Sequence, residues 1–566
     1  MRFRIWWKVC PKPRIVTHHE VLSLEILQGC DNNKPTRGEA KTRRKQSEQE
    51  HLAYTSVLFL QVDLLEQDVL KVLNLVRSVK NDFAPINRIP GAVLSLIPNY
   101  WDRQYIDTSK DLVALTHVCR GWRKLFTSHP SLWTRLDFTN VEKTHVYIKR
   151  SRSLPLEVTI CKTKAESSLE EALLLAVPHI RRFKSLTIVG IKDPLQNLTK
   201  HLTSPAPSLR ELIIDFNCTP APALDSNLFN GDLSLLNTLT LGGVVTCLPW
   251  KNLWNLTAFK LRCAPGSGVT VTKLLGFLES AQNLRDITLH DSIPTSSNAC
   301  ASRVVPLPNL KNLAISGGTG YDVLLNHLYI PNGASLVLDF NFGGKKSLIR
   351  ACLPKTSKNL KNLFRVTTIN LRFDGKRKSV RLVGPNGVLY MIGHWEGEEN
   401  LNFPDDPVDC QILRSLNYFH LHAVRNLTIT KHDYLLPLDP DGLSPYDILP
   451  RMKDLCTLTL IRCNNLQFIS ALNPDLNPSK ITPYPDLKEL ILYVEARSGF
   501  YIKSLMRMAK ERESRGAKLR LVTIVGLGEL LPGREVFKLR EHVERVEYRV
   551  EENPPEWDGT PYGQSG

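Results

Sequence analysis

The sequence predicts an α/β protein in which a small all-helical module precedes a long array of parallel strands. Two observations predict this class. Residues 83–137 carry apolar side chains at helical spacing between proline-marked turns, and residues 138–550 repeat one strand-like apolar pattern. The chain of 566 residues is long enough for more than one folding unit. Its 42% apolar and 23% charged residues are typical of globular proteins.

The first 82 residues differ in character from the rest of the chain. Residues 1–50 are predicted to be a disordered basic segment, and they contribute to a formal net charge of +17. Their run Lys41, Arg43, Arg44 and Lys45 suits nucleic-acid binding or nuclear import, although a solvated tail is the simpler explanation. Residues 51–82 are predicted to form one leading amphipathic helix. Their apolar residues recur at helical spacing, at Leu58, Val62, Leu65, Val69, Val72, Leu73 and Val76.

Residues 83–137 are predicted to fold as a helical module. Pro90 suits the first turn of a helix, where its missing N–H costs nothing, and an apolar face follows it from Val93 to Ile97. Three helices in about fifty residues bury little surface alone, so the module needs the rest of the chain or another protein as a partner. A longer helix is predicted next, with apolar residues at i, i+3 and i+4 spacing at Leu112, Leu115, Val118, Cys119, Trp122 and Leu125.

This order of elements resembles an F-box, the short helical module that docks onto a Skp-type adaptor in cullin–RING ubiquitin ligases. The segment from this module to Ile160 most resembles the F-box proteins of mushroom-forming fungi. Where that family continues its Leu-Pro start with Pro-Glu, this chain has Gly91 and Ala92. A helical cap with ordinary core residues is the alternative. The resemblance implies an adaptor-binding surface made of Ile89, Pro90, Val93, Leu94, Ile97, Leu115, Val118, Cys119, Trp122 and Trp133.

Beyond Thr139 an apolar pattern recurs at positions a, a+3 and a+5. It resembles the L-x-x-L-x-L strand signature of leucine-rich repeats, which predicts an irregular leucine-rich-repeat solenoid with parallel strands over residues 138–550. An ordinary α/β domain of alternating strands and helices is the alternative. The occurrences are Phe183-Leu186-Ile188, Leu209-Leu212-Ile214, Leu236-Leu239-Leu241, Leu256-Phe259-Leu261, Leu284-Ile287-Leu289, Leu310-Leu313-Ile315, Val366-Ile369-Leu371, Val424-Leu427-Ile429, Leu455-Leu458-Leu460, Leu487-Leu490-Leu492, Leu519-Val522-Ile524 and Val543-Val546-Tyr548.

Two steps in this series, from 310 to 366 and from 366 to 424, are double length and predict insertions or degenerate repeats. Leu336 and Leu338 are candidates for a strand in the first. In the second, strand-like runs flank Pro385-Asn386-Gly387, which predicts a hairpin near residues 379–399 that interrupts the solenoid. Residues 551–566 are predicted to be a C-terminal tail.

Strand residues at a+2 and a+4 point away from the core, onto the concave face of such a solenoid. The next outward position is a+6. Mixed charge and an aromatic side chain suit a protein ligand better than a phosphate backbone. The predicted substrate-binding residues on this face are Lys260, Arg262, Asp286, His290, Arg372, Glu489 and Tyr493.

No catalytic motif is found, so the chain is not expected to be an enzyme, and no cofactor or metal is expected. None of the twelve cysteines forms a Cys-x-x-Cys pair, which is typical of reduced thiols in an intracellular protein. His420 and His422 alternate on a predicted strand, but no third ligand is placed near them. No apolar run is long enough to span a membrane.

These observations favour a substrate-recognition adaptor of an SCF-type cullin–RING ubiquitin ligase. Its expected partners are a Skp-type adaptor, a cullin reached through that adaptor, and a protein substrate, with no membrane and no nucleic acid. The expected location is the cytoplasm or nucleus. The alternative is a non-ligase leucine-rich-repeat scaffold or a basic nucleic-acid-associated protein, in which the helical module merely caps the solenoid.

Overall fold

The structure is a computed structural model, and it divides into two units: residues 1–99 with 117–121, and residues 100–116 with 122–566. Each unit is described by itself. The residues described are 37–100, 108–161, 166–190, 200–216, 224, 228–245, 253–263, 269–291, 303–317, 321–341, 359–363, 365–374, 377–394, 416, 419–431, 448–463, 465–476, 482–494, 502–527 and 537–552.

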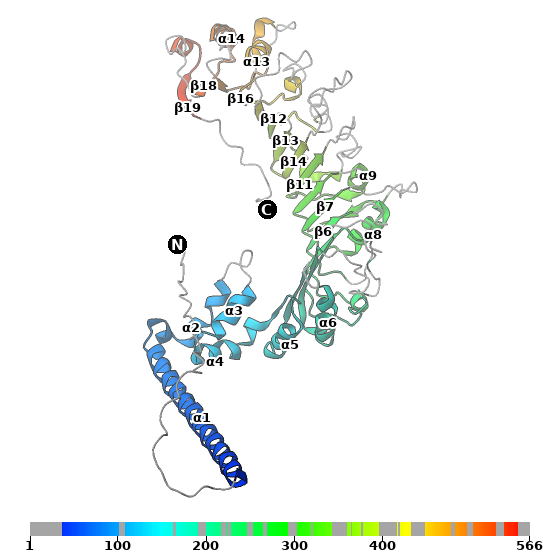
Figure 1. The fold of residues 1–566 in the computed structure, drawn as a ribbon. Coiled ribbons are helices and arrows are strands. Elements are labelled where there is room, and N and C mark those ends of the chain that lie inside the picture. Colours follow the sequence, from blue (N-terminus) through cyan, green and yellow to red (C-terminus); the bar gives the residue numbers. More distant parts are fainter. Residues whose placement is uncertain are drawn as a thin grey trace. The chain divides into compact units, whose positions relative to one another are not determined.

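The first unit is dominated by one long helix, α1 (Arg37–Asp82), which is labelled in Figure 1. The sequence prediction started this helix at residue 51 and left residues 37–50 disordered. That boundary was wrong, because from Glu39 to Glu50 the chain has neither proline nor glycine and is rich in good helix formers. Residues 1–36 lie outside the described part. Short helices follow: η1 (Pro85–Arg88), α2 (Gly91–Leu94) and η2 (Ile97–Tyr100).

The single helix predicted from Leu112 to Leu125 is in fact two, α3 (Thr108–Thr116) and α4 (Arg120–Ser128). Side chains satisfy the backbone where α3 ends. The Thr116 hydroxyl donates to Val113 O at 2.7 Å, and Arg123 Nε donates to Thr116 O at 2.9 Å. A carbonyl left free at a helix end needs such a partner, which apolar spacing alone does not reveal. Val118 and Cys119 therefore lie between helices rather than within one.

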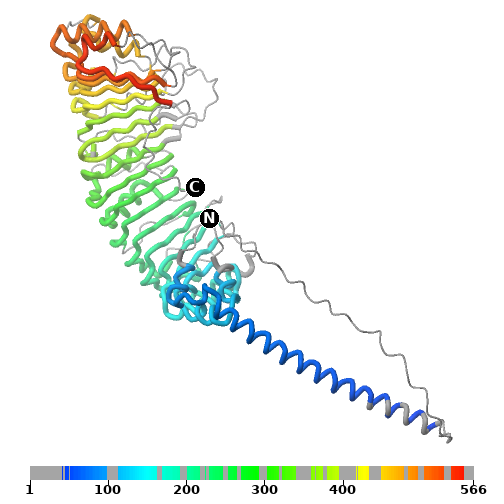
Figure 2. Tube along the Cα trace, turned by 90° about the vertical axis from the view of Figure 1, so that its left-hand side faces the viewer, coloured from blue at the N-terminus to red at the C-terminus, as the bar shows by residue number. Residues whose placement is uncertain are grey.

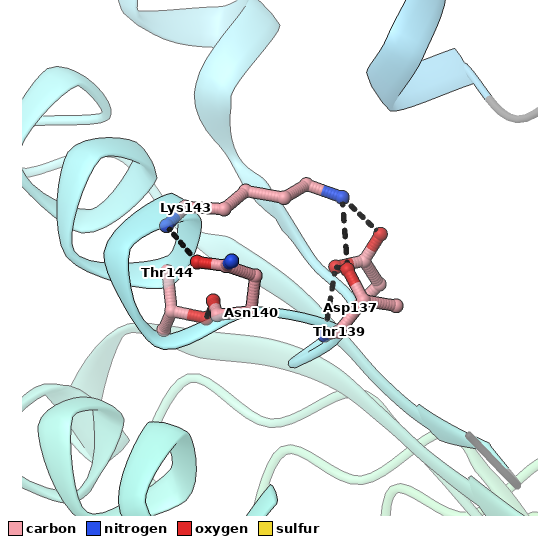
Figure 3. A network of polar contacts seen from close by, with 5 residues as sticks. All are labelled: Asp137, Thr139, Asn140, Lys143 and Thr144. Atoms are coloured by element: carbon pink, nitrogen blue, oxygen red, sulfur yellow. Dashed lines mark hydrogen bonds and ion pairs between the residues drawn. The ribbon is translucent and has the colours of Figure 1, made fainter. Parts of the chain in front are cut away.

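The second unit begins its sheet after η3 (Pro130–Trp133) with β1 (Arg135–Leu136), followed by α5 (Val141–Arg150). Figure 3 shows how α5 starts. The Asn140 side chain accepts a hydrogen bond from Lys143 N at 3.0 Å, and the Thr144 hydroxyl donates to Asn140 O at 2.9 Å. The Lys143 ammonium also pairs with Asp137. This N-cap ties the start of α5 to the residues that follow β1.

The described strands of the second unit form one seventeen-stranded sheet, and a separate pair is formed by β8 (Val305–Pro306) and β10 (Leu328–Tyr329). Figure 2 shows the strands of the large sheet lying side by side in succession. In chain order, the strands after β1 are β2 (Leu156–Cys161), β3 (Phe183–Val189), β4 (Glu211–Asp215), β5 (Thr238–Gly242), β6 (Ala258–Arg262), β7 (Asp286–His290), β9 (Asn312–Ser316), β11 (Ser335–Asn341), β12 (Thr368–Asp374), β13 (Arg377–Gly384), β14 (Gly387–His394), β15 (Asn426–Lys431), β16 (Thr457–Ile461), β17 (Glu489–Val494), β18 (Leu521–Leu527) and β19 (Arg545–Glu551). The spatial order is the same except between β11 and β15, where it runs β11-β14-β13-β12-β15.

Neighbouring strands are parallel and in register, with β13 the exception among those described. Leu212 pairs with Leu239, and Leu458 pairs with Leu490, as the repeat pattern predicts. The a+3 and a+5 residues are buried in one continuous core, except Tyr548, which is half-buried against it. The same core includes apolar residues of α6 (Glu166–Ala176), α8 (Val271–Ser280), α9 (Tyr321–Asn326), α13 (Asn465–Leu472) and α14 (Ile502–Ser514).

Within the two double-length steps, the order of strands in the sheet differs from their order in the chain. The strand expected at Leu336 and Leu338 is present as β11, which pairs with β9. The predicted hairpin is present as β13 and β14, joined through Pro385 and Asn386. It does not loop out of the sheet, however. β14 pairs with β11 in parallel, and β12 pairs with β15, so the hairpin supplies two strands of the sheet itself.

Candidate functional site

The residues predicted to bind an adaptor divide by exposure. Leu94, Trp122 and Trp133 are buried in the chain, and Leu115 and Cys119 are half-buried. The remaining five are exposed: Ile89, Pro90, Val93, Ile97 and Val118. The exposed members all belong to the first unit. They are free to contact another protein, whereas the three buried side chains can act only by holding the segment together.

Trp133 shows why a buried aromatic was mistaken for a contact residue. Its indole N–H donates to Phe126 O at 2.9 Å, its ring meets the Tyr147 ring edge-to-face at 4.9 Å, and the Arg150 guanidinium lies 4.3 Å from its centre. These contacts join the end of the helical segment to α5. Large aromatic rings dominate core packing, so Trp133 anchors this junction rather than presenting a surface.

Sequence reasoning left two exposed apolar residues of the first unit out of the predicted surface. Ile86 and Leu96 are as exposed as the predicted members Ile89 and Ile97. Leu96 lies in the turn between α2 and η2, and helical spacing cannot show which way a residue points outside a helix. Single exposed apolar residues are ordinary, but several within a dozen positions mark an interaction site.

The second surface is the polar strand face, which consists of Asp215, Lys260, Arg262, Asp286, His290 and Ser316. The four predicted members Lys260, Arg262, Asp286 and His290 come from β6 and β7, which are adjacent and parallel, and Arg262 is paired in register with His290. Their neighbours Phe259, Leu261, Ile287 and Leu289 are buried on the other side. These four side chains therefore share one face of the sheet, as predicted from the alternation of strand residues.

An ion pair crosses this face. Arg262 pairs with Asp215 of β4 and donates to Phe216 O at 2.5 Å, although β5 lies between the two strands. The intervening residue is Gly242, where an added Cβ would sit 2.1 Å from Asp215 Oδ1. Only a residue without a side chain leaves room for this crossing. Sequence reasoning missed Asp215, although it occupies position a+6 of its own repeat, like Arg262.

His290 is fixed beside this pair by a contact between Nδ1 and the Ser316 hydroxyl of β9. Burial lowers the pKa of His290, and the positive charges of Lys260 and Arg262 lower it further, while Asp291 and Asp215 oppose the shift. The imidazole is therefore neutral at pH 7 and can accept or donate a hydrogen bond. The face offers two cations, two carboxylates and a neutral ring within a few strands, which suits recognition of a polar peptide surface.

Three predicted members lie elsewhere. Arg372 is half-buried on β12, six strand steps from β6, or roughly 29 Å at about 4.8 Å per step. Glu489 of β17 is farther along the sheet, where it accepts from the Thr457 hydroxyl at 3.3 Å. Tyr493 is buried in an apolar cluster with Ile461, Val525 and Leu527. The seven residues thus do not form one patch, because position within a repeat shows which face a side chain occupies, while Arg372, Glu489 and Tyr493 belong to strands far along the sheet from β6 and β7.

The described side chains that bear metal-ligating groups do not gather at one place. Within the described ranges, no group of three or more His, Cys, Asp and Glu side chains could hold a metal ion. His420 and His422 have ring centres 6.1 Å apart, but they lie in the turn before β15 and not on a strand as predicted. Among the helices described, none combines the length and apolar character needed to cross a membrane.

Comparison with known proteins bears on the helical segment. No curated protein matches the chain. A protein-family model does match, and it covers residues 88–139, close to the 83–137 predicted from the sequence. The matched range includes the exposed residues Ile89, Val93, Ile97 and Val118 and ends just before the N-cap of α5. The chain therefore contains an F-box-like domain at residues 88–139, which supports its interpretation as an F-box protein.

Proposed function

We propose that this chain is the substrate-recognition subunit of an SCF-type cullin–RING ubiquitin ligase in the cytoplasm or nucleus. Its F-box-like domain docks onto a Skp-type adaptor, and through it the chain reaches the cullin. The single observation that carries the proposal is the family match over residues 88–139. The exposed apolar side chains of Ile89, Val93, Ile97 and Val118 in that range support it, because an adaptor interface needs them uncovered in the free chain.

In this proposal the large sheet is a leucine-rich-repeat-like solenoid, and the polar strand face binds a protein substrate. The in-register pairing of equivalent leucines and the continuous core support the repeat interpretation. The chain performs no chemistry itself. It holds the substrate lysine near a charged ubiquitin carrier, and this proximity raises the effective concentration of the reacting groups.

Charge distribution favours a protein substrate over a nucleic acid. Exposed basic residues do occur at position a+1 of seven repeats, at Lys184, Arg210, Arg285, Lys311, Arg425, Lys488 and Arg520. Acidic residues occupy neighbouring positions of the same sheet edge. Lys184 Nζ lies 3.3 Å from Glu157 Oε1, for example. A phosphate backbone would meet carboxylates along this edge. Tight binding to DNA with a steep dependence on salt would favour the nucleic-acid-associated alternative instead.

The test is affinity purification of the tagged full chain from cells, followed by mass spectrometry. The wild type should recover a Skp-type adaptor and a cullin together with one or more further proteins. The double variant Ile89→Glu/Val93→Glu should lose adaptor and cullin but keep the further proteins. A matched variant, Leu235→Glu, changes an equally exposed leucine in the second unit and should behave as wild type.

Two outcomes separate the competing functions. If the wild type recovers neither adaptor nor cullin while still recovering other proteins, the chain is a scaffold and the ligase proposal fails. If a protein retained by the Ile89→Glu/Val93→Glu variant becomes ubiquitylated only when the wild type is present, the recognition role is supported.

A further inference from the structure

Nothing in the described part of the first unit covers the large apolar side chains of α1. From Leu52 to Val79 the large apolar residues of this helix are exposed by 40–72%, and none of them is buried. Monomeric soluble proteins rarely leave so large an apolar surface in water, so exposure on this scale marks an interaction site. Most of the stability of a helix in a protein also comes from packing of its apolar face against other groups. Both facts require a partner along α1.

The spacing of these residues identifies the partner's shape. A set that we name the α1 seam is separated by alternating steps of four and three residues, which is the heptad repeat of a coiled coil. No charged residue interrupts it. The seam consists of Leu58, Val62, Leu65, Val69, Val72, Val76 and Val79.

The residue types at the two heptad positions of the seam, a and d, identify the partner itself. In heptad terms Val62, Val69 and Val76 occupy position a, and Leu58, Leu65, Val72 and Val79 occupy position d, so β-branched a residues alternate with leucine at d in the N-terminal half of the seam. β-branched residues at a with leucine at d favour a two-stranded parallel coiled coil of like helices. We propose that α1 pairs with α1 of a second copy of this chain, in parallel and in register, so that the protein is a dimer.

The area of this contact meets what a stable dimer needs. The seam spans 22 residues, or about 33 Å of helix. Two copies would remove on the order of 1,000 Å² of apolar surface from water, if each seam side chain contributes the area implied by about 1.5–3 kcal/mol at about 25 cal/mol per Å². That reaches the lower bound of about 1,000 Å² for a biological interface. Phe59, Leu73 and Leu75 flank the seam and would add to it.

Charged residues of α1 lie outside the seam and so remain in water on pairing. Lys71 Nζ and Asp68 Oδ1 form an intrahelical ion pair at 2.8 Å, and both side chains stay exposed. The dimer does not depend on the F-box-like domain binding an adaptor. If that binding also occurs, one dimer carries two docking domains and two polar strand faces, which raises avidity for a substrate that presents two copies of a motif.

The test is light scattering after size-exclusion chromatography of the full chain at micromolar concentration. The wild type should have twice the 64.1 kDa mass of one chain. The seam variant Leu65→Glu/Val69→Glu should raise the dissociation constant of the dimer by at least about 100-fold, because four carboxylates would enter two adjacent apolar layers. The matched variant Leu64→Glu/Leu70→Glu places the same charges on the same helix outside the seam and should remain a dimer.

Orientation is tested by Val79→Cys. In a parallel, in-register pair the two new thiols face each other near one end, and mild oxidation should give a covalent dimer beyond any that the wild type forms. Several results overturn the proposal. The wild type could be monomeric at every concentration, or have the mass of three or more chains. The Leu65→Glu/Val69→Glu variant could remain a dimer, or the Val79→Cys variant could dimerise without forming the crosslink. The first of these would indicate that α1 is covered by a different protein.

Discussion

At the scale of single residues, Gly242 illustrates a role that only the three-dimensional neighbourhood reveals. Its sequence context, Thr-Leu-Gly-Gly, indicates the end of a strand. In the structure it is the gap through which the Arg262 guanidinium reaches Asp215 across β5. The polar strand face thus depends on an absent side chain as much as on the charged ones.

We predict that Gly242→Ala lowers the free energy of unfolding by about 1–3 kcal/mol, the usual cost of overpacking. Its Cβ would lie 2.1 Å from Asp215 Oδ1, so the carboxylate must move away from Arg262. The control is Gly276→Ala in α8, where nothing lies within 4 Å of the new Cβ. Alanine should stabilise that helix by about 0.5–1 kcal/mol. Chemical denaturation of both variants measures the contrast, and equal effects would refute the steric explanation.

His290 gives the polar strand face a dependence on pH. Its folded-state pKa lies below the ordinary value of 6.5, so the unfolded chain binds the proton first as pH falls. The stability due to neutral His290 is therefore complete above about pH 6.5 and is lost as pH falls through that value towards the folded pKa.

We predict that His290→Gln reduces the fall in unfolding free energy between pH 7 and pH 5, because glutamine has no proton to take up. Denaturant midpoints of wild type and variant across this range provide the measurement. Identical pH dependence of the two proteins would contradict the lowered pKa. The pKa of His179 is also lowered, first by burial and then by the positive charge of Arg182. Comparing His179→Gln with His290→Gln therefore separates the contributions of the two histidines to the pH dependence.

At the scale of elements, a buried arginine attaches α14 to the turn that precedes β17. Arg512 donates from Nη1 to Pro483 O at 2.6 Å and from Nη2 to Tyr484 O at 2.9 Å. Burial lowers the pKa of Arg512 to about 10, so it remains charged at pH 7. Tyr484 has a positive φ of 51°, a conformation that a bulky residue adopts only when its surroundings enforce it.

We predict that Arg512→Met destabilises the second unit by about 1–3 kcal/mol for each buried carbonyl left without a donor. Methionine preserves the length and apolar packing of the side chain, so the loss reports the hydrogen bonds. Arg507→Met on the same helix removes only a 3.4 Å surface contact with Asp475 and should change stability by less than about 1 kcal/mol. A smaller loss for the Arg512 variant than for the Arg507 variant would refute the role.

Elements also show where sequence patterns predict structure and where they fail. Apolar periodicity correctly predicted the parallel strands and their register, because burial on one face is encoded in every repeat. It placed Val118 and Cys119 inside a helix, since the break after α3 depends on a hydrogen bond from Arg123 that spacing cannot show. It predicted the hairpin at Pro385-Asn386-Gly387, yet its incorporation into the sheet depends on pairings with β11 that are distant in sequence.

The residues predicted on the strand face were placed correctly in part, for the same physical reason. Lys260, Arg262, Asp286 and His290 were placed together correctly, because they belong to consecutive repeats. Tyr493 was expected on the surface but is buried among apolar neighbours from β16 and β18. Position within a repeat indicates which face a side chain occupies. It does not indicate what the neighbouring strands place beside that side chain.

At the scale of the whole molecule, stability should be shared between neighbouring strands. Leu458 and Leu490 are fully buried and paired in register on β16 and β17. Each substitution to alanine should cost about 2–5 kcal/mol. The double variant should depart from additivity by at least about 0.5 kcal/mol, because the two cavities adjoin.

Leu212 of β4 supplies the control for this coupling. It is equally buried but lies many strands from β17, so Leu212→Ala and Leu490→Ala should add within about 0.3–0.5 kcal/mol. Hydrogen exchange of the affected strands locates each effect. Coupling as strong in the distant pair as in the adjacent one would contradict a core built from nearest-neighbour contacts.

The most direct test of the central claim is titration calorimetry of the full chain with a purified Skp-type adaptor. We predict saturable binding of one adaptor to each chain. Ile89→Glu/Val93→Glu should weaken it at least about tenfold, equivalent to about 1.4 kcal/mol, and Leu235→Glu should leave it unchanged. No binding by the wild type, or equal binding by the wild type and the Ile89→Glu/Val93→Glu variant, would contradict the adaptor function.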